Sequence, residues 1–172
     1  MSQGTMRTDG LPLRASEAKE ARMTEARQQV DERIAARLRD PKVAHDVRTL
    51  GDFVAIYCAG HHKDRERRPA RTAAAEAGVY GRKPPRLCEE CEAHLAYGEK
   101  RRASCPKDPK PFCAHCDTHC YKSDEREWQR QMMRYSGPRS VLRGHAIDAV
   151  RHALEARSHR AAARRAASTE RK

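Results

Sequence analysis

Six cysteines fall within 33 residues of this chain, so metal binding or redox chemistry is the first possibility to weigh. Their spacing is C-x2-C-x13-C-x7-C-x2-C-x3-C, and a seventh cysteine, Cys58, precedes them. Thiols this close together are bridged by disulfides, bound to a metal, or used in redox exchange. The clustered residues are Cys88, Cys91, Cys105, Cys113, Cys116 and Cys120.

Two features of the sequence argue against a disulfide framework. The cysteine count of seven is odd, and residues 1–40 contain no apolar run that would mark a signal peptide. No window approaches the roughly 18–20 apolar residues of a membrane span. The sequence therefore predicts a cytoplasmic protein, where thiols stay reduced and a dense cysteine pattern favours metal binding over disulfides.

The metal prediction depends on two C-x2-C pairs, Cys88 with Cys91 and Cys113 with Cys116. Each pair places two thiolates within reach of one ion. Cys58 with His61 and His62 adds a second kind of ligand group, because residues three or four apart share one face of a helix. Buried free cysteines and a redox dithiol are the less favoured interpretations.

The sequence leaves the metal open between zinc and an iron–sulfur cluster. Zinc needs four ligands per ion, supplied by one site of four thiolates or by two sites that enlist Cys58 and histidines. An iron–sulfur cluster needs four cysteines, and the run C-x2-C-x3-C matches only part of a ferredoxin pattern, so a remote cysteine would complete it. The predicted ligands are Cys58, His62 and the six clustered cysteines.

Helices must position these ligands, because no stretch shows the alternating pattern of a strand. We expect helices over about 14–39, 41–58, 87–102, 123–136 and 139–157, with Asp40-Pro41 starting the second, Gly60 ending it, and Gly137-Pro138 ending the fourth. Apolar residues recur at helical spacing in each. The expected inward residues are Ala26, Val30, Ile34, Leu38; Val43, Val47, Leu50, Val54, Tyr57; Leu87, Cys91, Leu95; Trp128, Met132, Tyr135; and Leu142, Ala146, Val150, Leu154.

The predicted fold is a small all-α domain with a cysteine-rich metal-binding loop, flanked by a charged N-terminal helix and a basic C-terminal tail. Its expected parts are an N-terminal segment and helix at 1–41, the metal-binding domain at 42–157, and the tail at 158–172. Residues 63–86 form a polar insert, interpreted as a loop or disordered stretch that could contain a short helical turn.

The net charge of +12 is concentrated in two basic segments. Residues 59–87 carry eight basic and three acidic side chains, and residues 156–172 carry six and one. Segments 63–86 and 156–172 could therefore hold a nucleic acid or another polyanion, although solvated linkers are the simpler interpretation. The sequence contains no glycine-rich nucleotide loop and no recognisable catalytic arrangement, so we expect a protein without enzymatic activity.

Four stretches of the chain share their residue patterns with one known family. The stretches are Thr49-Leu50 with Ile56-Tyr57-Cys58 and His61-His62; Leu87-Cys88-x-x-Cys91 with Leu95-x-Tyr97; Cys113-x-x-Cys116-x-x-His119-Cys120-Tyr121; and Met133-Arg134-Tyr135-x-Gly137-Pro138-Arg139 with His152. Together they resemble the nitrous-oxide-stimulated promoter family of small bacterial proteins, over about residues 47–154.

This chain departs from the family pattern in two places. Residues 63–86 are longer than the connection expected in the family, and Ser140 with Gly144-His145-Ala146 stands where a methionine and a His-Pro pair are expected. The resemblance implies expression that responds to nitrogen oxides and a role in nitrosative stress, but it supplies no reaction and no catalytic residue. The resulting hypothesis is a metal-thiolate protein of the nitrosative stress response; the alternative is a nucleic-acid-binding regulator with structural zinc.

Overall fold

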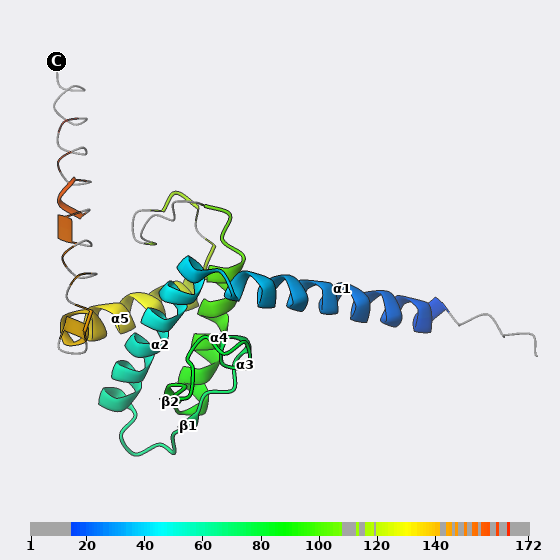
Figure 1. Cartoon of the computed structure of the whole chain (residues 1–172), viewed down its shortest axis with the longest axis horizontal. Coiled ribbons are helices and arrows are strands. Elements are labelled where there is room, and N and C mark those ends of the chain that lie inside the picture. The colour runs from blue at the N-terminus through cyan, green and yellow to red at the C-terminus, as the bar shows by residue number, and fades with distance from the viewer. Residues whose placement is uncertain are drawn as a thin grey trace, which may run out of the picture. The chain divides into compact units, whose positions relative to one another are not determined.

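The computed structural model describes residues 15–107, 113, 116–118, 120–141, 144–145, 147, 150, 153–154, 156–158, 161 and 165. Contacts divide the chain into two compact units, residues 1–33 and 34–172. Along the chain the elements are α1, α2, β1, α3, β2, α4 and α5 (Figure 1). The structure confirms the predicted helical class and adds one short pair of strands.

Helix α1 spans Ala15–Leu38 and is rich in Ala, Glu, Arg and Gln, which are strong helix formers. Only the C-terminal half of its expected apolar stripe is buried. Ile34 and Leu38 are buried within the second unit, whereas Ala26 is exposed. The Nε of Arg37 donates to the carbonyl oxygen of Ala103 at 3.4 Å, which fixes the end of α1 beside the end of α4.

Helix α2 spans Pro41–His61 and begins where the sequence predicts. The Asp40 carboxylate accepts hydrogen bonds from the backbone N–H groups of Val43 and Lys42, and these bonds hold the pKa of Asp40 below its usual value. Pro41 occupies the first helical position, where a backbone N–H would have no hydrogen-bond partner within the helix, so its absence costs nothing. The buried face of α2 carries Val43, Val47, Leu50, Val54 and Cys58.

The prediction that Gly60 ends α2 is wrong, because the helix continues to His61 and His62 is its C-cap. Tyr135 of α5 packs so closely against Gly60 that a Cβ at this position would overlap the tyrosine ring. The glycine therefore permits the close approach of α5 to α2 and does not terminate the helix.

The insert at 63–86 is an ordered loop with a short helix and two short strands, so the loop interpretation is confirmed and the disordered alternative is wrong. Strands β1 (Arg68–Pro69) and β2 (Arg86–Leu87) pair antiparallel, and the short helix α3 (Ala73–Glu76) lies between them. The short helix confirms the expected helical turn, which Thr72 caps by accepting from the N–H of Ala75 at 3.4 Å. The buried side chains of the insert are Ala70, Thr72, Ala74 and Val79.

Glu99 of α4 anchors this insert through hydrogen bonds. Its buried carboxylate accepts hydrogen bonds from the Tyr80 hydroxyl at 2.6 Å, the Thr72 hydroxyl at 2.8 Å and the Ala74 N–H at 3.2 Å. Burial raises the pKa of Glu99, whereas these hydrogen bonds lower it, and the effect of burial is the larger. The insert is thus held by polar contacts that its own composition does not reveal.

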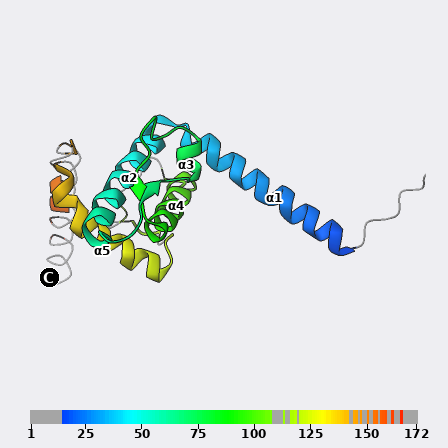
Figure 2. The same cartoon turned by 90° about the horizontal axis from the view of Figure 1, so that it is seen from below.

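Helix α4 spans Glu89–Ala103, with Cys88 as its N-cap. Its first turn is acidic and its last turn is basic, which complements the helix dipole. Arg102 Nε donates to the Asp46 carboxylate at 2.6 Å, joining the end of α4 to α2. Helix α2 lies beside both α4 and α5 (Figure 2).

Helix α5 spans Ser123–Ser140 and starts as predicted, with Asp124 and Glu125 in its first turn. The predicted break at Gly137-Pro138 is wrong, because the helix continues through the proline. Pro138 has no N–H to donate to the carbonyl of Arg134, four residues earlier, so the helix continues with one backbone hydrogen bond missing. Two side chains bond to other carbonyls of this turn: Arg139 donates to the Tyr135 carbonyl at 2.8 Å, and the Ser140 hydroxyl donates to the Gly137 carbonyl at 2.7 Å.

Part of the helix expected over 139–157 and most of the tail at 158–172 lie outside the described residues, and so do Leu142 and Ala146. At the described positions Ile147, Val150 and Leu154 are exposed. Among the residues that the structure describes, no helix is both long enough and apolar enough to cross a membrane.

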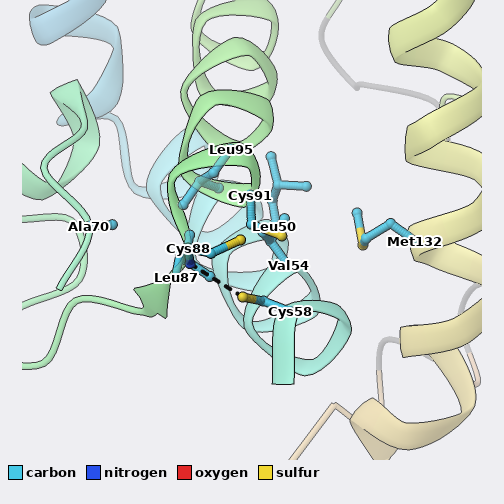
Figure 3. Packing of buried hydrophobic residues seen from close by; sticks show 9 residues of the cluster. All are labelled: Leu50, Val54, Cys58, Ala70, Leu87, Cys88, Cys91, Leu95 and Met132. Carbon is cyan, nitrogen blue, oxygen red and sulfur yellow. Dashed lines mark hydrogen bonds between the residues drawn. The ribbon is translucent and has the colours of Figure 1, made fainter. Parts of the chain in front are cut away.

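The core lies where α2, α4, α5 and β2 meet, and sulfur atoms occupy its centre (Figure 3). Trp128, Met132 and Tyr135 of α5 were expected to face inward; Met132 is fully buried and the other two are half-buried. The buried cluster consists of Leu50, Val54, Cys58, Ala70, Leu87, Cys88, Cys91, Leu95 and Met132.

Candidate metal centre

Four side chains with metal-binding atoms meet where α2 ends and α4 begins. They are Cys58, His62, Cys88 and Cys91, and their ligand atoms all lie within 4.8 Å of one another. Nδ1 of His62 lies 3.2 Å from Sγ of Cys88 and 3.2 Å from Sγ of Cys91. The backbone N–H of Cys88 donates to Sγ of Cys58 at 3.4 Å (Figure 3).

Local helix geometry explains why the sequence brings these atoms together. Cys58 and His62 stand four residues apart at the C-terminal end of α2, and the backbone N–H of His62 bonds to the Cys58 carbonyl at 2.9 Å. Cys88 and Cys91 stand three residues apart across the first turn of α4. Pairing of β1 with β2 delivers Leu87 and Cys88 to the end of α2.

The thiols are buried, which makes their negative charge costly without a cation. Cys58 and Cys91 are fully buried and Cys88 is 3% exposed. Burial, followed by the charge of Cys58, raises the pKa of the Cys91 thiol, and burial also raises that of Cys58. Burial opposes ionisation of Cys88 as well, but hydrogen bonds from Cys91 hold the pKa of Cys88 below its usual value.

The histidine is suited to be a ligand, because metals bind neutral imidazole. Burial and the neighbouring Arg65 lower the pKa of His62. The Arg65 side chain also contacts Cys88 and forms a close ion pair with Glu90. A pocket of about 550 Å³ lies beside Cys88 and is lined in part by Arg65, Arg68 and Glu90.

The geometry fits one tetrahedral ion. A Zn²⁺ ion with bonds of about 2.3 Å to sulfur and about 2.0 Å to nitrogen holds its ligand atoms roughly 3.6–3.8 Å apart. Ligand atoms within 4.8 Å of one another need only a small adjustment to reach that arrangement. An iron–sulfur cluster needs more space, since its iron and sulfide atoms stand between the cysteines.

The other predicted ligands do not join this group. Cys105, Cys113, Cys116 and Cys120 lie beyond the C-terminal end of α4, and all are half-buried or exposed. Among the described residues, the second C-x2-C pair, Cys113 and Cys116, is not part of the group of ligand atoms at the end of α2. The helix α4 separates Cys91 from Cys105 by roughly 20 Å, at 1.5 Å per residue. His115 and His119, also in this region, lie outside the described residues.

The remaining histidines near the centre have other contacts. His61 stacks on Tyr57 at 4.4 Å between ring centroids, and it is exposed. His94 stacks on Trp128 at 3.9 Å and pairs with Glu125 at 2.8 Å. Sequence reasoning missed this aromatic packing, which covers the centre on the α5 side.

Sequence reasoning also missed Glu99, although a signal for it was present. Cys91, Leu95 and Glu99 recur every four residues along α4, so they share one face of the helix. An acidic residue that continues a buried apolar stripe must find hydrogen-bond donors, because an unpaired buried carboxylate is very costly. The stripe therefore indicated a buried polar contact at Glu99, but not its partners.

The fold and the site define a small helical protein with three cysteines and one histidine grouped as they would be around a metal ion. A family model described as nitrous oxide-stimulated promoter matches residues 41–165. The chain belongs to this family, as the resemblance of its motifs indicates.

A curated relative, the protein YgbA of Escherichia coli, is 41% identical to this chain over 68 residues. The match covers 39% of this chain and 57% of that protein, so the chain spans little more than half of the relative's length. No solved structure matches the chain.

Proposed function

We propose that this chain is a zinc-thiolate protein, without enzymatic activity, of the bacterial response to nitrogen oxides. Its zinc ligands are Cys58, His62, Cys88 and Cys91. The observation that carries the proposal is the grouping of four buried or half-buried ligand atoms within 4.8 Å. The family description supports the link to nitrogen oxides.

The ion would act first as a structural link between the end of α2 and the start of α4. Because the unfolded chain lacks the site, the free energy of metal binding adds to the stability of the folded protein. Three cysteine ligands require reduced thiols, which supports a cytoplasmic location. Nitrogen oxides that attack thiolates would loosen this link, and the pocket lies beside one of its thiols, Cys88.

The first measurement is the metal and acid-labile sulfide content of protein purified without oxygen. We expect zinc, no acid-labile sulfide and no visible absorbance. Iron with sulfide and a broad brown absorbance would contradict the zinc assignment.

Adjacent histidines provide a matched pair of variants for the ligand assignment. We expect His62→Gln to weaken zinc binding at this centre at least about 100-fold, since even a residue that only orients a ligand costs 10–100-fold. His61→Gln should leave the affinity nearly unchanged, because His61 is outside the group. Zinc competition with a chelator, followed by fluorescence, measures both variants.

The fluorescence reports this centre in particular. Trp128 is the single tryptophan of the chain, and Tyr57 contacts both Trp128 and His62, at 5.5 Å and 6.0 Å between ring centroids. Equal effects of the two histidine variants would contradict the ligand assignment.

A second candidate function is binding of a nucleic acid or another polyanion. A pocket of about 400 Å³ beside the insert is lined by four basic side chains, Arg48, Arg67, Lys83 and Arg86, and one acidic side chain, Asp52. This excess of positive charge supports phosphate binding through segment 63–86. Segment 156–172 could add further contacts, but most of it lies outside the described residues.

This candidate predicts binding to duplex DNA whose log affinity falls linearly with log salt concentration. Changing Arg67 and Lys83 to alanine should reduce the slope by up to about 0.9 per lost phosphate contact. Lys19→Ala with Arg22→Ala on α1 removes the same charge and serves as the control. Equal slopes for both double variants would contradict binding through the insert.

A further inference from the structure

Three of the seven cysteines belong to the centre at α2 and α4, and four are not part of it. They are Cys105, Cys113, Cys116 and Cys120, and all four fall between the end of α4 at Ala103 and the start of α5 at Ser123. Residues 104–107 leave α4 at the end of the helix opposite to β2 (Figure 1). The centre formed with His62 lies at the β2 end, so these four thiols are separate from it.

Both ends of this cysteine segment are fixed to the C-terminal half of α4. At one end, the backbone N–H of Cys105 bonds to the carbonyl oxygen of Arg102 at 3.2 Å. At the other, the N–H of Lys122 donates to the Tyr97 hydroxyl at 3.0 Å, and the rings of Tyr121 and Tyr97 meet edge to face at 5.4 Å. The first and last of the four cysteines are therefore held near the same helix end.

The middle pair is arranged in a turn. The backbone N–H of Cys116 bonds to the Cys113 carbonyl at 3.4 Å, a bond between residues three apart. A turn of this kind points two cysteine side chains toward one side, as a C-x2-C metal ligand pair requires.

An ion pair across the segment brings its two halves together. Lys107, two residues after Cys105, forms a close ion pair with Asp117, which directly follows Cys116. Cations beside the sulfurs would offset the negative charge of four thiolates.

The described residues of this segment are not held by burial of apolar side chains. At every position between 104 and 120 that the structure describes, the residue is half-buried or exposed. The segment has four thiols, the full ligand number of a structural zinc site. Binding of an ion would supply the ordering free energy that apolar packing does not.

We propose that Cys105, Cys113, Cys116 and Cys120 form a second site, which binds one Zn²⁺ through four thiolates at the C-terminal end of α4. The site does not depend on the centre at Cys58, His62, Cys88 and Cys91, and each could be filled without the other. Because its sulfurs are exposed or half-buried, the second ion exchanges with chelators and reacts with thiol-modifying agents first. The chain then carries one protected zinc and one labile zinc.

Cadmium-113 NMR of the full chain tests this proposal without any substitution. We expect two resonances per chain, one typical of four sulfur ligands and one of three sulfurs with one nitrogen. A spectrum without the four-sulfur resonance would overturn the second site. Zinc analysis of the native protein should agree, with two ions per chain, and iron with acid-labile sulfide at the segment would equally overturn the assignment.

Substitutions then separate the two sites. The double variant Cys113→Ser/Cys116→Ser should lose the four-sulfur resonance and retain the other, while Cys91→Ser should do the reverse. If the segment variant keeps both resonances, the second site is wrong. If Cys91→Ser leaves both in place, the centre at α2 and α4 is wrong, so the two proposals fail by different results.

Chelator kinetics test the difference in exposure. Zinc release to a coloured chelator should show a fast and a slow phase of equal amplitude in the native protein. The double variant Cys113→Ser/Cys116→Ser should lose the fast phase alone, with Trp128 fluorescence showing that the core is intact. Loss of the slow phase instead would contradict the assignment of the labile ion to the segment.

Discussion

Replacing Cys91 with serine is expected to remove the metal from the centre at α2 and α4 and to lower the free energy of unfolding by at least about 3 kcal/mol. Cys91 is fully buried in the core, where its sulfur lies 3.2 Å from Nδ1 of His62. Serine cannot replace the thiolate as a zinc ligand, and it leaves a hydroxyl among apolar side chains. Urea unfolding with excess zinc, followed by Trp128 fluorescence, measures the loss.

A chelator distinguishes loss of the metal from loss of packing. Removing zinc from the native protein should destabilise it by an amount similar to the Cys91→Ser change. Adding the chelator to Cys91→Ser should have little further effect, because two changes that remove the same interaction are not additive. If the chelator destabilises the variant as much as the native protein, the Cys91 sulfur does not hold the stabilising metal.

Val54→Thr is the matched control for this experiment. It also places a hydroxyl among the buried side chains of the core cluster, but Val54 is not one of the grouped ligands. The chelator should therefore destabilise Val54→Thr by as much as it destabilises the native protein. A chelator effect as small as that in Cys91→Ser would show that the effect is not specific to the metal ligands.

Local signals in the sequence predicted most of the helical fold. The Asp40-Pro41 start of α2 and the acidic start of α5 depend on neighbouring residues alone, and both are confirmed. The two wrong helix ends lie at Gly60 and at Gly137-Pro138. At Gly60, the close packing of Tyr135 outweighs the local preference of glycine, and a single sequence does not contain that contact. At Pro138, the helix continues although the proline removes one backbone hydrogen bond.

The candidate site shows the same division between local and tertiary information. Cys58, His62, Cys88 and Cys91 were all predicted as ligands, since each pair has helical ligand spacing. The meeting of the two pairs at one centre was not predictable, because it depends on the β1–β2 pairing inside an insert interpreted as a loop. The separation of Cys105 from Cys91 was available in principle, because the thirteen residues between them have helical composition and a helix of that length keeps them apart.

The Glu99 carboxylate should be the main support of the insert, and Glu99→Leu is expected to lower the free energy of unfolding by about 2–4 kcal/mol at pH 7. Leucine fills a similar volume but leaves the hydroxyls of Thr72 and Tyr80 and the N–H of Ala74 without their acceptor. Urea unfolding measures the loss, and amide hydrogen exchange should show faster exchange across residues 70–81.

Glu89→Leu is the matched control, because Glu89 lies on the same helix but is exposed. We expect it to cost less than about 1 kcal/mol, the range of a favourable charge in the first turn of a helix. Equal losses in the two variants, or unchanged exchange across 70–81 in Glu99→Leu, would contradict the anchoring role of Glu99.

The pH dependence of stability gives an independent test of the same group. Burial raises the pKa of Glu99, so the folded state binds this proton more tightly than the unfolded state. The contribution of Glu99 is then fully present below its unfolded pKa, about 4.3, and decreases as pH rises through the higher folded pKa. Glu99→Gln resembles the protonated form and cannot ionise.

The stability of the native protein relative to Glu99→Gln should therefore fall as pH increases from about 4.5 toward 7. Taking this difference removes the titration of the metal ligands, which both proteins share. Glu92 and Tyr80 also face Glu99, and Asp52 acts on Tyr80; burial raises the pKa of Tyr80, which keeps its hydroxyl protonated throughout this range. A difference that rises with pH would mean that the three hydrogen bonds outweigh burial and that Glu99 is most stable in the fold as a carboxylate.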